Sequence, residues 1–196
     1  MRVNESLLRG LIRETLLTEA AMTPVRASEL GIRFQVRKYA YHAAIYAHKE
    51  GRDGPVAILE AGSRTGDPCA GAWAIAYSHS RIDGLGPLMY DLMIDVISPN
   101  PLAPDRGVVS RDAKRVWDYY LTRRDDIEAI QLDDLDNTLT PEEDDNCLQV
   151  SATDRKHGEV DWTSSSLSKA YRRKGGIRPT FDELDRLGLI DTWRRI

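Results

Sequence analysis

The chain has 196 residues, a length that fits one large domain or one domain with appendages. Hydrophobic residues make up 41% of the sequence and charged residues 30%, a balance that can build a core and excludes bulk disorder. No apolar run approaches the ~18 residues that a membrane span needs. The net charge of -4 argues against a nucleic-acid-binding protein, since such proteins usually carry a basic excess.

The cysteine and histidine content points away from a metal or disulfide framework. Cys69 and Cys147 lie far apart in the sequence and cannot by themselves define a disulfide framework or a zinc site. They favour a reduced intracellular setting. The four histidines show no spacing typical of metal ligands, so we predict no metal site.

Residues 1–24 are interpreted as an N-terminal amphipathic leader or docking helix. Leucine and isoleucine recur at helical spacing from Leu7 to Leu16, Asn4 can act as N-cap, and Pro24 ends the pattern. Charged residues run through the segment, which excludes a secretory signal peptide. The simplest interpretation is a helix that packs on the domain or on a partner.

Residues 25–132 are predicted to form the core of the fold. Apolar and alternating patterns predict strands at 32–36, 41–48, 55–61 and 71–77. Short loops join these strands, which implies an antiparallel meander. The pattern then changes and predicts a glycine-containing loop with a helix in 81–97, a helix at 111–123 capped by Ser110, and a strand at 127–130.

The glycine-containing loop has the clearest chemical meaning in the chain. It reads Arg81-Ile82-Asp83-Gly84-Leu85-Gly86 and lies between a predicted strand and a predicted helix. Such a loop can direct free backbone N–H groups at an anion, and the helix dipole assists binding. Two alternatives stay open: the glycines form a tight turn with no ligand, and Arg81 is a solvated or ion-paired surface residue.

This loop resembles the Arg/Gln-x-x-Gly-x-Gly/Ala motif of the GCN5-related N-acetyltransferases, which also follows a strand and opens a helix. Further along, Ser110-x-x-Ala113-x-x-Val116-Trp117 resembles the later Asn-x-x-Ala-x-x-Leu-Tyr segment of that family. The resemblance covers roughly residues 30–132. It implies an α/β (α+β) fold with a mixed, mostly antiparallel twisted sheet flanked by helices.

The resemblance also implies acetyl-CoA as cofactor, with Arg81, Gly84 and Gly86 binding its pyrophosphate, and an amine or a basic peptide as acceptor. Three residues depart from the family pattern. Pro87 removes one backbone N–H at the start of the helix. Asp83 places a carboxylate in the loop that would meet the pyrophosphate. Trp117 stands where the family carries the tyrosine that protonates the departing thiolate, and an indole N–H cannot serve as that acid. No catalytic residue is therefore assigned.

Three further residues bear on catalysis. Glu60, on a strand before the motif, can act as general base only if it faces the cleft, which the alternation does not decide. Tyr119 and Tyr120 follow Trp117, but on a helix they point roughly 200° and 300° away from it. We interpret the aromatic residues Trp117, Tyr119 and Tyr120 as core and interface side chains.

The leader carries a second resemblance. Leu17-Thr18-Glu19-Ala20 resembles the Leu/Ile-x-Glu cleavage site that prohead proteases of T4-like bacteriophages recognise. This implies a protein of a tailed phage, in the host cytoplasm or the virion, whose N-terminal helix contacts phage structural proteins. Two functions therefore compete: an acetyl-CoA-dependent N-acetyltransferase, and a catalytically inactive, virion-associated structural or interaction protein with the same fold.

Residues 133–196 are predicted to form an acidic loop and a C-terminal helical extension that packs on the core. Acidic residues crowd between Asp125 and Asp145. They fit no EF-hand pattern, so we interpret them as a solvated loop that can also contact a basic partner.

A strand is predicted over 148–152, and helices are predicted in the rest of the C-terminal third. Ser164 to Ser166 offer N-caps for a helix over 167–171, and the basic residues 172–174 would form its solvated end. A final helix is predicted to begin with Thr180 as cap and to end at Gly188. The hydrophobic residues near 191–193 are expected to dock on the core.

Overall fold

The computed structural model describes residues 21–63, 69, 71–135, 138–149 and 161–193, in a mixed α+β fold. The predicted leader helix and its cleavage-site-like residues 17–20 lie outside this part of the chain. The strands are β1 (Ile32–Lys38), β2 (His42–Lys49), β3 (Pro55–Gly62), β4 (Trp73–Ser80), β5 (Leu102–Ala103), β6 (Ile127–Gln131), β7 (Lys169–Arg173) and β8 (Ile190–Trp193). The helices are α2 (Pro24–Glu29), α3 (Leu85–Ile97), α4 (Arg111–Arg123) and α6 (Pro179–Arg186), with short 3-10 helices η2 (Ser166–Ser168) and η3 (Lys174–Gly176).

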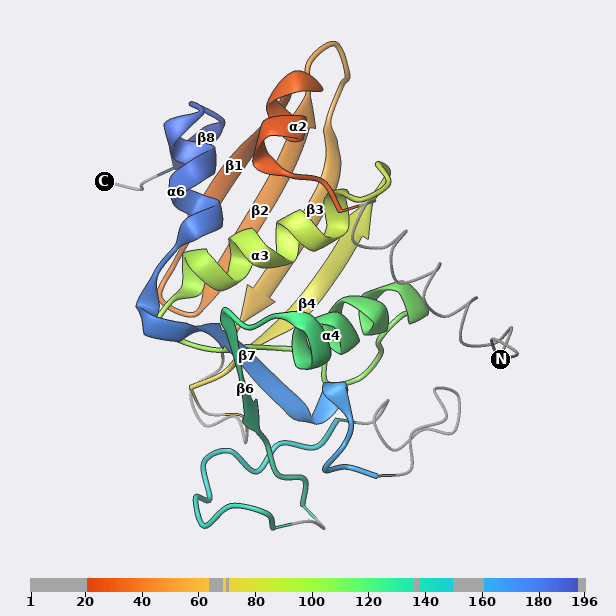
Figure 1. Ribbon diagram of the computed structural model, residues 1–196, viewed down its shortest axis with the longest axis vertical. Helices are drawn as coiled ribbons and strands as arrows, with labels where there is room; N and C mark the ends of the chain where they lie inside the picture. The colour runs from red at the N-terminus through yellow and green to blue at the C-terminus, as the bar shows by residue number, and fades with distance from the viewer. Residues whose placement is uncertain (1–20, 64–68, 70, 136–137, 150–160, 194–196) are drawn as a thin grey trace, which may run out of the picture.

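All eight strands belong to one sheet, in the order β6-β7-β5-β4-β3-β2-β1-β8 (Figure 1). The neighbours β4 and β5 are parallel, and so are β1 and β8. The other neighbouring pairs are antiparallel. The predicted α+β class with a mixed, mostly antiparallel sheet is therefore confirmed. Two of the strands, β7 and β8, come from the C-terminal third of the chain.

Strands β1 to β4 form the antiparallel meander that the sequence predicts. In β1, Ile32, Phe34 and Val36 are buried, while Arg33 is exposed. Because side chains alternate across a strand, one face of β1 packs against the helices and the other meets solvent.

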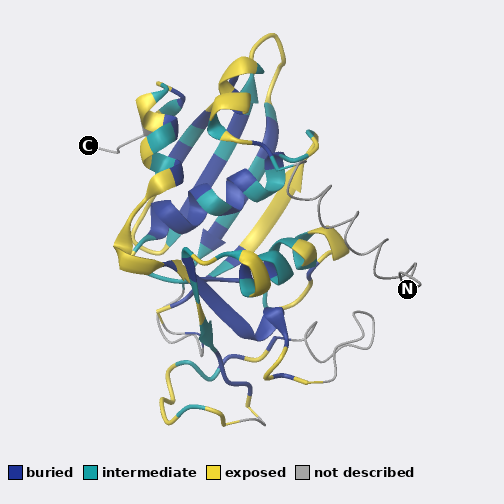
Figure 2. Ribbon diagram, in the orientation of Figure 1, coloured by how far each residue is buried: buried dark blue, intermediate teal, exposed yellow. Residues whose placement is uncertain are grey.

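Helix α3 lies across the face of this meander and is buried along most of its length (Figures 1 and 2). Its side chains Leu85, Leu92 and Met93 are fully enclosed and share one core with Phe34 and Leu59 of the sheet. Each buried side chain of this size contributes about 1.5–3 kcal/mol to stability. The apolar spacing that predicts this helix is therefore the spacing of its core contacts.

A buried ion pair fixes the C-terminal half of α3. Arg173 Nε donates to Asp95 Oδ1 over 2.7 Å, and the two side chains are 1% and 0% exposed. The other carboxylate oxygen of Asp95 accepts the backbone N–H groups of Thr180 and Phe181 at 2.7 and 2.9 Å. Arg173 also contacts Asp126, just before β6. Asp95 therefore joins α3 to β7 and to the first turn of α6.

The prediction of a helix over residues 167–171 is wrong, because these residues end η2 and begin β7. Strand β7 inserts between β5 and β6, so the adjacent residues Ala170 and Tyr171 are both buried. Its partner β6 lies about forty residues earlier in the chain, where local propensity cannot detect it. Arg173 accordingly lies in the core and not at a solvated helix end.

Helix α6 begins at Pro179, one residue before the predicted start, and Gly188 follows its end in a left-handed conformation, φ 69°. The prediction that Thr180 caps this helix is wrong. Thr180 lies inside the first turn, and the acceptor for its N–H comes from Asp95 on α3. The expected docking near residues 191–193 is confirmed, because β8 pairs with β1.

The two cysteines are joined in a disulfide, so the expectation that they define no such bond is wrong. Their Cα atoms lie 4.8 Å apart although 78 residues separate them in sequence. Cys69 comes shortly before β4, and Cys147 directly follows an isolated bridge between Asp133 and Asn146. The folded sheet brings the two segments together, which spacing in the sequence does not reveal.

Replacing Asp95 with alanine should destabilise the protein by about 3 kcal/mol, because Arg173 loses its fully buried partner and keeps only the more exposed Asp126 and Asp91, and because the first N–H groups of α6 lose their acceptor. Urea denaturation followed by tryptophan fluorescence measures this loss. Asp182→Ala, in an exposed ion pair with Arg178, is the control and should cost less than about 1 kcal/mol. Equal small losses for both variants would contradict the proposed role of Asp95.

Acid should weaken the fold through Asp126. A bidentate hydrogen bond from Arg124, with N–O distances of 2.7 and 2.9 Å, lowers the pKa of Asp126 to about 2. The stabilising contribution is therefore complete above the ordinary pKa of 3.8 and is lost as pH falls through 2. We expect Asp126→Asn to be less stable than wild type at pH 7 and to show a smaller loss of unfolding free energy between pH 4 and 2. An unchanged pH profile would exclude this role.

Candidate functional site

A pocket of about 580 Å³ opens where β4, α3 and α4 meet. Its volume lies within the range of small-molecule and cofactor sites. The second half of β4, the glycine-containing loop and the N-terminal turns of α3 and α4 form its walls. The described residues that line it are Ala21, Ser78, His79, Ser80, Ile82, Asp83, Gly84, Gly86, Pro87, Tyr90, Ser110, Asp112, Ala113, Arg115, Val116 and Tyr119.

The pocket lies beside a part of β4 that β5 does not reach. Strands β4 and β5 pair only at Trp73 with Leu102 and at Ala74 with Ala103. After Ala103 the chain leaves the sheet for α4, while β4 continues to Ser80. The space beside the second half of β4 is therefore left to the pocket.

The glycine-containing loop turns the chain sharply from β4 into α3. Gly84 is the N-cap of α3 with φ 75°, a left-handed conformation that glycine adopts without steric cost. The hydroxyl of Ser80 accepts a hydrogen bond from the N–H of Ile82 over 3.3 Å and donates to its carbonyl over 2.9 Å, which stabilises the turn. Gly86 then contributes a first-turn N–H, for which a helix provides no acceptor of its own.

Of the three residues that the sequence proposes for cofactor binding, two line the pocket and one does not. Gly84 and Gly86 line the pocket. Arg81 is exposed and is absent from the described lining residues; its backbone N–H donates to Val56 on β3 over 2.9 Å. Asp83 does line the pocket, so the carboxylate noted in the sequence is present at its wall.

Helix α4 forms the opposite wall, and Ser110 caps it as predicted, accepting the N–H of Ala113 over 3.1 Å. Trp117 faces away from the pocket. It is 1% exposed and stacks on Tyr171 of β7 with ring centroids 5.2 Å apart. Tyr120 is also buried, whereas Tyr119 lines the pocket. The interpretation as core aromatics is therefore confirmed for Trp117 and Tyr120.

Tyr90 is a pocket residue that the sequence analysis missed. It lies one turn into α3, is 3% exposed, and its hydroxyl makes a 3.2 Å hydrogen bond to Ser78 on β4. Burial raises the pKa of Tyr90, so the phenol keeps its proton at neutral pH. In the sequence it stands within an apolar helical pattern and resembles a core residue. Only the tertiary structure shows that Tyr90 lines a pocket, beside Ser78 of β4.

Glu60 does not meet the condition for a general base at this pocket. It alternates on β3 with the buried Leu59 and Ala61, and the described pocket residues do not include it. Its carboxylate accepts a hydrogen bond from Tyr46 over 3.2 Å and lies 3.7 Å from His42. Glu60 therefore belongs to the opposite face of the sheet.

The pocket wall carries groups of both charges. Asp112 and Arg115 form an exposed ion pair at 2.8 Å, and Asp83 adds a further carboxylate. Across the part of the chain that the structure describes, no group of three or more His, Cys, Asp or Glu side chains is placed to hold a metal ion. No described helix is long and apolar enough to cross a membrane.

Comparison with known proteins finds no matching family model, no matching curated protein and no matching solved structure. A functional assignment therefore depends on the geometry of the pocket and on the motif at its wall.

The two glycines at the pocket should respond differently to alanine. Gly84→Ala should destabilise the protein by about 1–2 kcal/mol, because an L side chain at φ 75° is strained. Gly86→Ala should be neutral or slightly stabilising, since an added Cβ meets no atom within 4 Å and alanine favours the helix. Thermal unfolding of the two variants measures the difference, and equal destabilisation would contradict this assignment of the turn.

Proposed function

We propose that the pocket binds an acyl-CoA, with acetyl-CoA as the ligand, in a domain that resembles the GCN5-related N-acetyltransferases. The observation that carries the proposal is the position of the glycine-containing loop. It opens α3 at the wall of a pocket beside the second half of β4, beyond the two residues at which β4 pairs with the parallel strand β5. A diphosphate at a helix N-terminus and an extended arm beside a free strand edge both suit this arrangement.

The residues present fit such a ligand in part. The N–H of Gly86 and the positive end of the α3 dipole would hold the pyrophosphate, and the open space at Gly86 admits its close approach. The edge of β4 beyond Ala74 would meet the amide-containing pantetheine arm. Asp83 opposes an anion here, and Arg81 would have to swing from its exposed position to assist. Binding in the micromolar range is therefore expected.

Acetyl transfer would require a group that protonates the departing thiolate. Trp117 cannot supply it, since the indole is a donor with a very weakly acidic N–H and lies in the core. Tyr90 and Tyr119 are the phenols at the pocket wall, and Tyr90 is held protonated by burial. The acceptor would be an amine, either a small molecule or a basic peptide, which the carboxylates of Asp83 and Asp112 would attract.

A second function is favoured by the position of Trp117. Trp117 is a core residue at the position where the resembling family carries its catalytic tyrosine. Without that acid, the same fold can serve as a catalytically inactive structural or interaction protein of a phage particle. In that role the N-terminal helix would contact phage structural proteins. This origin, the location in host cytoplasm or virion and the cleavage site at residues 17–20 stay predictions from the sequence.

Titration calorimetry with acetyl-CoA tests the first function. Wild type should bind with a micromolar dissociation constant, Gly86→Leu should weaken binding at least about 10-fold by filling the open space, and Gly86→Ala should have a smaller effect. The thermal stability of both variants reports whether the fold is retained. No heat and no thermal shift with wild type would exclude acyl-CoA binding.

The structural function has its own measurement. Mass spectrometry of purified phage particles should find this chain if it is a virion protein, and the N-terminal peptide would show whether residues 1–19 are removed. Acetyl-CoA binding together with absence from particles would favour the enzyme.

A further inference from the structure

The second half of β4 is a strand edge with no partner strand among the residues that the structure describes. Strand β5 pairs with β4 only at Trp73 and Ala74, whereas β4 continues to Ser80. Residues 76–80 are all exposed, and Figure 2 shows this part of the strand uncovered beside the buried centre of the sheet. An open edge therefore lies within the sheet, next to the pocket.

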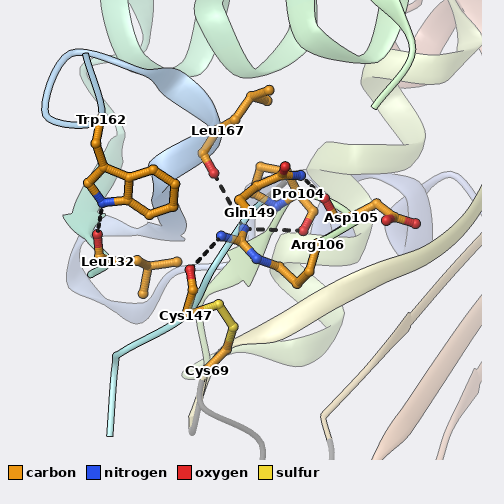
Figure 3. The surroundings of a disulfide bond; sticks show 9 residues. All are labelled: Cys69, Pro104, Asp105, Arg106, Leu132, Cys147, Gln149, Trp162 and Leu167. Atoms are coloured by element: carbon orange, nitrogen blue, oxygen red, sulfur yellow. Dashed lines mark hydrogen bonds between the residues drawn. A yellow bond between two sulfur atoms is a disulfide. The ribbon is translucent and has the colours of Figure 1, made fainter. Parts of the chain in front are cut away.

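The chain that follows β5 is fastened elsewhere and does not extend along this edge. Pro104 directly follows β5 and has no N–H to contribute to a ladder. The guanidinium of Arg106 donates to the carbonyl of Cys147 over 3.1 Å (Figure 3). The side-chain amide of Gln149 donates to the carbonyl of Asp105. Strand β5 would have to break these hydrogen bonds to cover β4, so the edge stays open.

Alternate residues of the edge direct their backbone groups toward the pocket. In an antiparallel ladder, residues that bond the neighbouring strand alternate with residues whose N–H and C=O groups point the other way. The N–H of Arg81 donates to Val56 on β3 over 2.9 Å, and the pairing of β4 with β3 is regular from Tyr77 to Ser80. Ser80 and Ser78 therefore direct their N–H and C=O groups away from β3, on the side of the pocket that both residues line.

The sequence of this edge lacks the residues that usually keep a strand from pairing with another chain. Exposed edges are commonly protected by proline, by charged side chains or by a bulge. Residues 76–80 read Ala-Tyr-Ser-His-Ser, without proline, lysine, arginine or an acidic residue. The register shift that leaves Ala76 unpaired with β3 comes before the regular stretch. The stretch from Tyr77 to Ser80 is therefore a suitable template for a further strand.

The groove beside the edge has the shape and lining for an extended backbone. The pocket of about 580 Å³ lies between β4 and α4, whose side chains Ala113, Val116 and Tyr119 line the opposite wall. At ~3.3 Å per residue, the edge from Tyr77 to Ser80 spans roughly 10 Å. An occupant of about four or five extended residues would match this length, with every second side chain against the apolar wall.

The charge at one end of the groove favours a basic occupant. Asp112 is paired with Arg115 at 2.8 Å. Asp83, which lies shortly after Ser80 and also lines the pocket, has no ion-pair partner among the described residues. A lysine or arginine side chain near this end would therefore meet a carboxylate that is still available.

We infer that the pocket-facing edge of β4 binds an extended, basic peptide segment of another protein by strand addition. The peptide backbone pairs with the N–H and C=O groups of Ser78 and Ser80, and a basic side chain lies near Asp83. This inference does not depend on acyl-CoA binding. Because the pantetheine arm of an acyl-CoA would use the same edge, the two ligands exclude each other.

Amide hydrogen exchange followed by NMR tests whether the edge is open in the full-length protein. The amides of Ser78 and Ser80 should exchange at least about 10-fold faster than the amide of His79, whose N–H points to β3. Equal protection of the three amides would mean that another segment of the chain covers the edge, and this result would overturn the inference.

The probe for binding is an acetylated and amidated hexapeptide of alternating valine and lysine. At saturation it should slow exchange at Ser78 and Ser80 at least about 10-fold. The same peptide with N-methylated backbone amides keeps the side chains, removes the donors and should have no effect. Equal slowing by both peptides, or no slowing by millimolar probe, would overturn strand addition. Glutamate in place of lysine should weaken binding at least about 3-fold, and equal affinity would contradict the basic occupant.

A proline substitution tests the edge from the side of the protein. Ser78→Pro removes a donor that points to the pocket and leaves the ladder with β3 intact, so the fold should be retained and peptide binding should weaken at least about 10-fold. Ser78→Ala is the control; it loses the hydroxyl contact with Tyr90, keeps the N–H and should bind as wild type does. Circular dichroism verifies the fold of both variants, and wild-type affinity in a folded Ser78→Pro would overturn the inference.

Competition separates this inference from the proposed ligand. Acetyl-CoA that binds should displace the peptide from the protein. Peptide protection of Ser78 and Ser80 without any binding of acetyl-CoA would refute the proposed ligand and leave the peptide site intact. Acetyl-CoA binding without peptide protection would refute the peptide site alone.

Discussion

The buried carboxylate of Asp95 is the interaction on which the positions of three elements depend. It lies on α3, neutralises Arg173 of β7 and accepts the first free N–H groups of α6. Burial raises the pKa of Asp95, because the charged form is desolvated, while Arg173 and the two backbone donors act in the opposite direction. A charge enclosed in this way is costly to leave unpaired, so the relative placement of α3, β7 and α6 is strongly constrained.

This constraint reaches the pocket through the rigidity of α3. The helix is fixed by Asp95 near its C-terminal end and carries Gly84 and Gly86 at its N-terminal end. Its central residues are packed against the sheet, so the glycine-containing loop cannot shift independently of the core. The α4 wall has no equivalent burial of its first turn and depends on the loop after β5. The two walls of the pocket are therefore held by different interactions, a buried ion pair near the end of α3 on one side and the Asp105 turn with the Ser110 cap of α4 on the other.

The chemistry at the pocket favours binding over catalysis. Backbone N–H groups at Gly86 and a free strand edge suit an extended, phosphate-bearing ligand, whereas the lining carboxylates of Asp83 and Asp112 weaken the attraction for an anion. The aromatic cluster of Trp117, Tyr120 and Tyr171 serves the core. Any acid–base role falls to Tyr90 or Tyr119, which the sequence motif does not identify.

The sequence by itself determined the β1–β4 meander, the turn at Gly84 and the Ser110 cap of α4. Each of these features depends on a local signal, namely the apolar pattern of the strands, the position of a glycine and a capping serine. Tertiary structure alone decided that residues 169–173 form a central strand, that Arg173 is buried, that Cys69 meets Cys147 and that Tyr90 reaches the pocket. All four depend on partners that are remote in the chain or on the point where β5 ends beside β4. Local periodicity carries no information about such partners, since pairing energy appears only when the sheet has assembled.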